Sequence, residues 1–133
     1  MRALIVESDL ISREILQRVL ENYGKCDLAV NGREAVEAVE QALNASRPYE
    51  LICMDMIISE LSGLDALRRI RRIEKEHGLS RRDEAKVIVV TELNDPTDVI
   101  KALYEGGASA YFVKPIEVKV LCQEIEKLGL IKN

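Results

Sequence analysis

Aromatic residues, cysteine pairs and long apolar runs are scarce in this 133-residue sequence. It contains no tryptophan and one phenylalanine, so we expect a core built from aliphatic side chains. Its three cysteines (Cys26, Cys53 and Cys122) form no Cys-x-x-Cys pair, which argues against a zinc site or a disulfide framework and favours buried small hydrophobes. No apolar run approaches the roughly 20 residues that a membrane-spanning helix needs.

The sequence also has little excess of charge of either sign, since its formal net charge is −4. This balance disfavours direct binding of nucleic acid by the domain. The N-terminus reaches an acid at Glu7, too early for a signal peptide, so we expect a cytoplasmic protein with no membrane association. The length and the apolar fraction of 47% predict a single domain over residues 1–133 with a substantial core.

Five short apolar runs are typical of buried strands: residues 3–6, 26–30, 51–54, 87–90 and 110–113. Amphipathic helical patterns follow each run, after Ser8 or Asp9, from Asn31, from Gly63, from Asp95, and after Pro115. Strict alternation of strands and helices predicts an α/β fold, a doubly wound five-stranded parallel sheet with five helices on both faces.

Two of the expected helices have patterns that assign their faces. The first has an apolar stripe at three- and four-residue spacing, made of Ile11, Ile15, Leu16, Val19 and Leu20. The third has an apolar stripe opposite a basic series, which we interpret as a solvated face: Arg68, Arg69, Arg71, Arg72 and Lys75.

Four of the five strands end in residues able to support chemistry: Glu7, Asp55, Thr91 and Lys114. Right-handed crossovers place the C-terminal ends of parallel strands at one edge of the sheet, so we expect these side chains to converge. Clustered carboxylates favour Mg²⁺, and a lysine opposite them pairs with a carboxylate or with a phosphoryl group. The pattern therefore predicts a site that holds a phosphoryl group against Asp55 as the nucleophile.

Several residues in their order carry a resemblance to a known family. Asp55 is followed eight positions later by Gly63, Thr91 ends the fourth run, and the fifth run continues as Tyr111-Phe112-Val113-Lys114-Pro115. The whole chain resembles a receiver domain of bacterial two-component response regulators, of the chemotaxis-regulator type. This resemblance implies the strand order 2-1-3-4-5.

The resemblance also implies a role for each of these residues. Asp55 accepts a phosphoryl group from a sensor histidine kinase or a phosphotransfer protein, and Lys114 contacts that group. The peptide bond between Lys114 and Pro115 is expected to be cis. Mg²⁺ is held by Glu7, Asp55 and the main-chain carbonyl of Ile57, with Ser8 or Asp9 as a candidate further ligand. Thr91 and Tyr111 act as switch residues.

The expected output is a change in the surface formed by the fourth helix, the fifth strand and the fifth helix, which would then bind a downstream protein target. The domain is expected to be a monomer, or a weak homodimer through that surface. We expect a signalling module with no enzymatic turnover. It is either a stand-alone regulator or a piece of a longer protein.

Five positions depart from the family pattern: Ser8 replaces an acid, Ile57 replaces a polar residue, Ser59 replaces a proline, Glu92 replaces a small residue, and Leu93 follows it. These departures keep a second hypothesis open, in which the chain is a phosphorylation-independent pseudo-receiver that acts as an interaction module. In that case Mg²⁺ binding is weak or absent unless Ser8 is compensated.

Two rival classes remain as alternatives. A flavodoxin-like binding protein would want a Ser/Thr/Gly-rich phosphate loop after the first strand, which this sequence lacks. A phosphatase with an aspartate nucleophile would want a second acid two residues after Asp55, and that position is Ile57.

Overall fold

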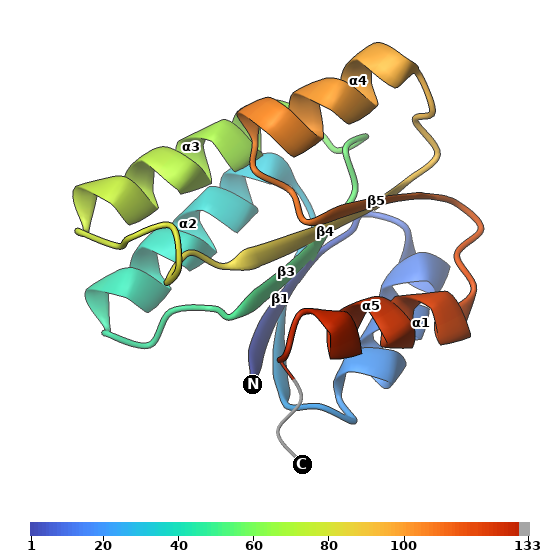
Figure 1. The fold of residues 1–133 in the computed structure, drawn as a ribbon, viewed down its shortest axis with the longest axis horizontal. Coiled ribbons are helices and arrows are strands. Elements are labelled where there is room, and N and C mark those ends of the chain that lie inside the picture. The colour runs from blue at the N-terminus through green and yellow to red at the C-terminus, as the bar shows by residue number, and fades with distance from the viewer. Residues whose placement is uncertain (131–133) are drawn as a thin grey trace.

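The computed structural model describes residues 1–130 and contains five parallel strands that alternate with helices (Figure 1). The elements are β1 (Arg2–Val6), α1 (Leu10–Leu20), β2 (Lys25–Ala29), α2 (Gly32–Asn44), β3 (Leu51–Met54), α3 (Gly63–Glu76), β4 (Lys86–Thr91), α4 (Pro96–Ile100), the π-helical turn η1 (Lys101–Glu105), β5 (Ala110–Val113) and α5 (Val118–Lys127). The strand order β2-β1-β3-β4-β5 confirms the predicted doubly wound sheet.

The sheet lies between two layers of helices. Figure 1 places α1 and α5 on one face and α2, α3 and α4 on the other. Alternate strand residues point to the two faces, so Leu4 and Ile52 pack in one apolar cluster while Ile5 and Cys53 pack in the other. Every residue of β3 is fully buried, as expected for a central parallel strand. This burial fixes the position from which Asp55 leaves the sheet.

The cysteines behave as small core residues, as predicted. Cys53 is buried, Cys26 and Cys122 are half-buried, and all three are free thiols. Burial is the main reason that the pKa of Cys53 is raised to about 12, so this thiol stays protonated.

Side-chain caps start four of the helices. Asp9, Asn31 and Asp95 accept main-chain N–H groups at the starts of α1, α2 and α4, as the sequence predicted. Ser62 caps α3 in the same way, and this cap was not predicted from the sequence. These caps matter for the site because each helix follows a strand, so the caps fix where the helices begin at the C-terminal edge of the sheet.

The predicted apolar stripe of α1 was wrong at its N-terminal half. Leu16, Val19 and Leu20 are buried, whereas Ile11 and Ile15 are 69% and 44% exposed. With about 3.6 residues per turn, Ile11 lies well round the helix from Leu16 and Leu20, whereas Ile15, one turn before Val19, lies at the margin of the buried stripe. Ile15 instead lines a surface pocket beside Lys114.

The solvated-face interpretation of α3 was wrong for Arg71. Its side chain is 14% exposed, and its guanidinium donates to the carbonyls of Ala85, Gly106 and Gly107 at 2.8 to 3.1 Å. Its Nη1 also lies 2.8 Å from Oε1 of buried Glu74. The planar guanidinium donates hydrogen bonds to three carbonyls at once, and these bonds replace the ones that an exposed arginine would make to water.

The fourth helix also differs from the single helix that the sequence predicted. An α-helix over Pro96–Ile100 passes into a π-helical turn over Lys101–Glu105, and Gly106 N donates to Lys101 O at 3.0 Å. No residue of Pro96–Ile100 is buried. Ala102 is the buried contact of the following turn.

Candidate phosphoacceptor site

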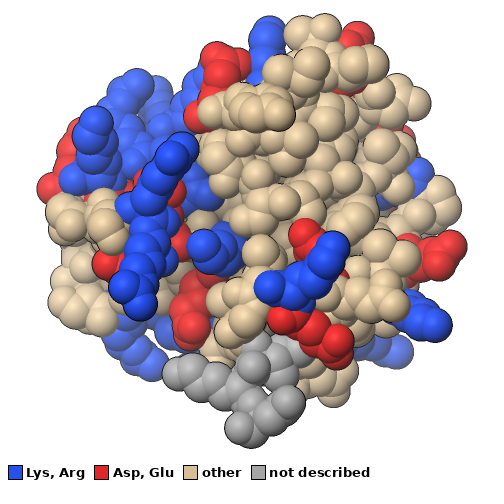
Figure 2. Space-filling model, viewed as in Figure 1, with Lys and Arg blue, Asp and Glu red and all other residues tan. Residues whose placement is uncertain are grey.

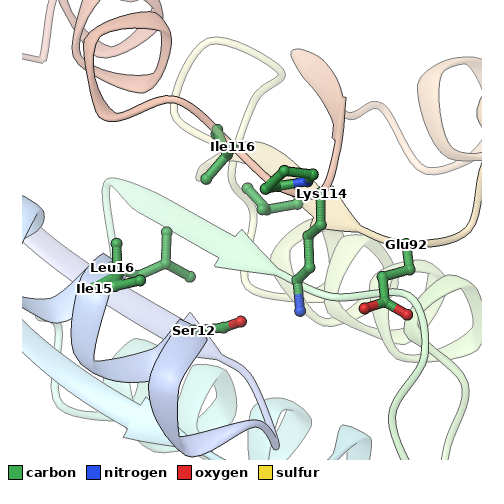
Figure 3. Close-up of a pocket in the computed structure, with 8 residues that line it drawn as sticks. Ser12, Ile15, Leu16, Glu92, Lys114 and Ile116 are labelled. Atoms are coloured by element: carbon green, nitrogen blue, oxygen red, sulfur yellow. The ribbon is translucent and has the colours of Figure 1, made fainter.

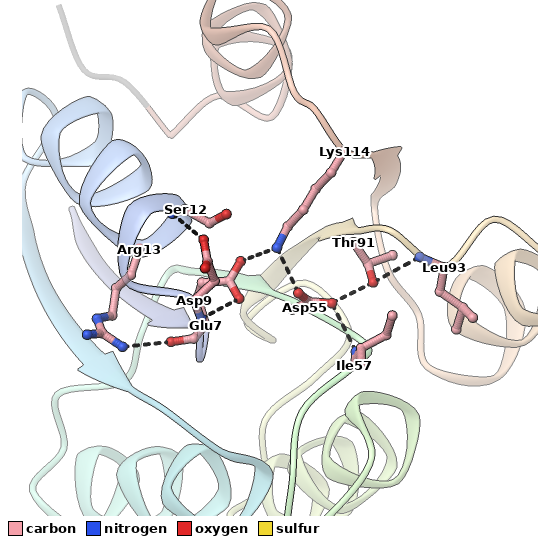
Figure 4. A network of polar contacts seen from close by, with 9 residues as sticks. All are labelled: Glu7, Asp9, Ser12, Arg13, Asp55, Ile57, Thr91, Leu93 and Lys114. Atoms are coloured by element: carbon pink, nitrogen blue, oxygen red, sulfur yellow. Dashed lines mark hydrogen bonds and ion pairs between the residues drawn. The ribbon is translucent and has the colours of Figure 1, made fainter.

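Four strand ends deliver the predicted polar side chains to one edge of the sheet. Glu7 follows β1, Asp55 follows β3, Thr91 ends β4, and Lys114 follows β5. Figure 4 shows their side chains linked in one network of polar contacts. The convergence expected from parallel topology therefore occurs, across a sequence separation of 107 residues between Glu7 and Lys114.

Asp55 is the centre of this network and is 6% exposed. Its Oδ1 accepts hydrogen bonds from Ile57 N at 2.9 Å and from Thr91 Oγ1 at 2.5 Å. Its Oδ2 accepts one from Lys114 Nζ at 2.9 Å. Three donors from three segments thus fix the orientation of the carboxylate, a condition for a nucleophile that must meet a bound reactant.

Lys114 bridges Asp55 to Glu7. Its Nζ lies 2.6 Å from Glu7 Oε1, and Glu7 is 1% exposed. Burial raises the pKa of Glu7, and the charge of Asp55 adds to this, while the hydrogen bond from Lys114 opposes it. Burial alone would lower the pKa of Lys114, but its bonds to Glu7 and Asp55 raise it overall, so the amine stays charged.

The side chains of Ser8 and Asp9 make no hydrogen bond to Asp55 or Lys114 within residues 1–130. Asp9 Oδ2 accepts from Ser12 N at 2.9 Å, which confirms the cap that the sequence offered as one role for it. Its main-chain N–H donates to Glu7 Oε2 at 3.3 Å. Ser8 is exposed. The family places an acid at position 8, and the role of Ser8 or Asp9 as a further metal ligand stays a prediction.

The two carboxylates of Glu7 and Asp55 are enough protein ligands for Mg²⁺. Over residues 1–130, no group of three or more His, Cys, Asp or Glu side chains gathers to hold a metal ion. Glu7 and Asp55 nevertheless share one cation, the Lys114 ammonium, and Mg²⁺ is commonly bound by one or two carboxylates with waters and phosphate oxygens. The N–H of Ile57 bonds to Asp55, and the role of its carbonyl stays a prediction.

A hydrogen-bonded chain runs from Asp55 to Tyr111. Thr91 Oγ1 donates to Asp55 and accepts from Leu93 N at 3.3 Å. The carbonyl of Leu93 then accepts from Tyr111 OH at 2.6 Å. Both residues named as switch residues are therefore tied to the same short segment, which the sequence did not reveal because the link runs through the main chain of Leu93.

The unusual Glu92 directly follows Thr91 and lies beside the site. It is exposed and lines a pocket of about 360 Å³ between α1 and the β5–α5 connection, together with Ser12, Ile15 and Lys114 (Figure 3). Ile57 is 54% exposed at the same edge. Neither side chain replaces a contact of the Asp55 carboxylate.

Gly63 supports the site through its lack of a side chain. A Cβ built there would lie 2.4 Å from Met56 Cα and 2.7 Å from Asp55 O. The N–H of Gly63 donates to Met56 O at 3.0 Å. The eight-residue spacing from Asp55 thus has a physical reason, since the start of α3 packs directly on the chain leaving β3. Arg13, which donates to Glu7 O at 3.2 Å, had no signal in the sequence.

Comparison with known proteins places the chain in a family. The model of the response regulator receiver domain matches residues 3–126. The chain belongs to this family. This match confirms the resemblance to a phosphorelay receiver that was drawn from the order of Asp55, Gly63, Thr91 and Lys114.

Individual relatives support the assignment. The chain is 30% identical over 128 residues to the transcriptional regulatory protein AruR of Pseudomonas aeruginosa, covering 96% of this chain and 48% of that protein. It is 31% identical over 150 residues to the osmolarity two-component system protein SSK1 of Saccharomyces cerevisiae, covering 97% and 20%. The chain thus spans at most about half the length of these relatives.

Solved structures give the same picture. The receiver domain of Saccharomyces cerevisiae Ssk1, crystallised with the histidine phosphotransfer protein Ypd1, has a TM-score of 0.80 at 30% identity, covering 97% of this chain and 88% of that one. The receiver domain of sensor histidine kinase PA1611 from Pseudomonas aeruginosa, with magnesium in its active site cleft, has a TM-score of 0.76 at 25% identity, covering 96% and 97%. In residues 1–130, no helix is long and apolar enough to cross a membrane.

Proposed function

We propose that Asp55 accepts a phosphoryl group from a phosphohistidine of a sensor histidine kinase or a phosphotransfer protein. An oxygen of Asp55 attacks phosphorus, the P–N bond breaks, and the donor ring, which carries a proton on its other nitrogen, leaves as neutral imidazole with the electron pair of the broken bond. The observation that carries the proposal is the fixed Asp55 carboxylate with Lys114 Nζ 2.9 Å from Oδ2. That ammonium is in reach of both the nucleophile and the charge gained in the product.

Magnesium belongs to the same proposal. Glu7 and Asp55 would hold it, with the Ile57 carbonyl as a third donor, and bound Mg²⁺ would neutralise the oxygens of the transferred group. Support comes from two carboxylates that already share one cation. Removing Mg²⁺ with a chelator is expected to abolish phosphorylation and to leave the fold intact.

The phosphodonor is proposed to dock on the first turns of α1. Leu10 and Ile11 are 58% and 69% exposed, and Ile15 lines the pocket that also reaches Lys114. Apolar side chains exposed together next to a reactive group mark an interaction surface. This position would bring a donor histidine to the Asp55 edge of the sheet.

The output surface is proposed to be the one formed by α4 with η1, by β5 and by α5. Ile100, Tyr104 and Val113 are 55%, 82% and 44% exposed there. A downstream protein, or a second copy in a weak homodimer, would cover them after the Thr91–Leu93–Tyr111 chain rearranges. We propose residues 1–133 as one receiver domain that acts in the cytoplasm as a switch, with no turnover of a small-molecule substrate.

The deciding experiment is incubation with acetyl phosphate and Mg²⁺ followed by intact-mass measurement. We expect the mass of one added phosphoryl group in the unmodified sequence and none in Asp55→Asn. The pseudo-receiver hypothesis, favoured by Ser8 and Glu92, predicts no added mass in either protein. A mass gain that persists in Asp55→Asn would contradict Asp55 as the acceptor.

A further inference from the structure

The most basic stretch of the chain lies on α3 and on its connection to β4. Residues 68–86 contain eight Lys or Arg and four Asp or Glu, a net charge of +4, so the rest of the chain carries −8 within the total of −4. Figure 2 shows Lys and Arg side chains gathered on the left of the view, where Figure 1 places α3 and this connection. Charge is therefore segregated on this molecule.

Six side chains of this stretch have no acidic partner within 4.0 Å among residues 1–130, and we call them the basic face: Arg69, Arg72, Lys75, Arg81, Arg82 and Lys86. Along α3, Arg69, Arg72 and Lys75 of the basic face follow one another at three-residue spacing, so they are neighbours on the helix surface. Like charges at this spacing destabilise a helix by a few tenths of a kcal/mol per pair. An acidic partner would relieve this repulsion.

A pocket of about 370 Å³ borders the basic face. Arg81, Arg82 and Lys86 of the face line it together with Arg71, and its one acidic lining residue is Glu84, whose Oε2 lies 3.7 Å from Arg71 Nη1. It is located where β4 begins, whereas Asp55 and Thr91 lie where strands end. A ligand here would therefore occupy the edge of the sheet opposite the phosphoacceptor and leave that site open.

The chemistry of the face selects one class of ligand. Lipid insertion would need apolar side chains, but the large exposed apolar residues of the described chain lie outside positions 58–99. Base stacking would need aromatic rings, and residues 63–86 contain no Phe, Tyr or Trp. Four arginines of the face instead offer planar forks that match carboxylates in pairs.

We propose that the basic face and its pocket bind an Asp/Glu-rich segment of a partner protein while the Asp55 edge stays accessible. A short flexible segment can contact this face without approaching the acidic remainder of the surface, which would repel an extended polyanion. This contact is independent of phosphorylation chemistry. It gives the domain a second attachment point beyond the docking of a phosphodonor.

The test is fluorescence anisotropy with a labelled oligoglutamate peptide of about ten residues at low ionic strength, where surface charges are least screened. The full chain is expected to bind this peptide and to ignore a serine-glycine peptide of equal length. Arg81→Glu/Arg82→Glu is expected to weaken binding at least about tenfold. Both side chains are exposed, so the fold, checked by circular dichroism, should be unchanged.

The matched control is Arg18→Glu/Lys119→Glu, which makes the same change in net charge at exposed positions on α1 and α5. It is expected to change affinity less than about twofold. Equal weakening in both variants would mean that net charge alone governs binding, and would overturn the proposal. Tighter binding of a single-stranded oligonucleotide or of anionic vesicles than of the peptide would overturn it as well.

Discussion

Replacing Lys114 with methionine tests the buried charge network most directly. The substitution keeps an unbranched side chain of similar length and removes the one cation among residues 1–130 that contacts both Glu7 and Asp55. The side chains of Glu7 and Asp55 are 1% and 7% exposed and that of Lys114 is 14% exposed, so water screens the network poorly. Removing one partner of a buried ion pair typically costs about 3–5 kcal/mol, a large part of the 5–15 kcal/mol that holds a domain folded.

The decrease in the free energy of unfolding caused by Lys114→Met should depend on pH in a defined direction. The pKa of Glu7 is already raised above its ordinary value by burial and by Asp55, and Lys114 opposes that rise. The variant loses this opposition, so the pKa of Glu7 rises further. A raised pKa in the folded state adds stability that is complete below about pH 4.5 and is lost as pH rises through the folded value. The deficit of Lys114→Met should therefore grow from about pH 5 toward neutrality.

Urea unfolding of both proteins at about pH 5 and about pH 7.5 measures this effect. Lys119→Met, at an exposed position on α5, is the matched control and should change the free energy of unfolding by less than about 0.5 kcal/mol. Glu7→Gln/Lys114→Met should recover part of the loss, and added Mg²⁺ should stabilise the single variant by binding its folded state. A deficit below about 1 kcal/mol at pH 7.5, or one equal at both pH values, would refute the buried network.

Four other substitutions have expected outcomes. Arg71→Met should lower the free energy of unfolding by about 3–5 kcal/mol because it leaves a buried carboxylate on α3 unpaired, and a loss within 1 kcal/mol by urea titration would contradict this. Gly63→Ala should cost about 1–3 kcal/mol through overpacking and should slow acetyl phosphate labelling, whereas normal labelling would separate this contact from the site. Tyr111→Phe should cost about 1 kcal/mol and increase amide hydrogen exchange near Leu93, with unchanged exchange as the contrary result. Ile57→Asn should shorten the phosphoaspartate lifetime by admitting water, and an equal or longer lifetime by mass measurement would oppose that.

Strand positions were the part of the fold that the sequence predicted best. Central parallel strands are buried on both faces, so runs such as 51–54 and 87–90 contain almost nothing but aliphatic residues. Their order followed from the family resemblance, and the meeting of Glu7 with Lys114 followed from topology. Boundaries moved by one residue at β1, β2 and β4, where the edge of a run does not mark the last ladder pair.

Side-chain direction was harder to predict, because partners distant in sequence decide it. Arg71 looked like a surface residue by its spacing, yet the carbonyls of Gly106 and Gly107, 35 and 36 residues away, draw it inward. Ile11 looked like a core residue by its type and is exposed where α1 borders the site. The π-helical turn after Ile100 left no mark in the apolar pattern, since a shift of one main-chain bond changes no residue type.

The uneven support of α4 indicates which part of the surface a phosphorylation switch would move. Beyond η1, Arg71 holds the carbonyls of Gly106 and Gly107. At the other end, the segment leading into α4 is tied through Leu93 to Thr91 Oγ1 and to Tyr111 OH, and Pro96–Ile100 contributes no buried side chain. Thr91 Oγ1 serves both Asp55 and Leu93, so drawing that hydroxyl toward a phosphoryl group would loosen Leu93 at little cost to the core. We therefore propose α4 with Tyr111 as the bistable element, pivoting on the end of η1 that Arg71 holds through Gly106 and Gly107.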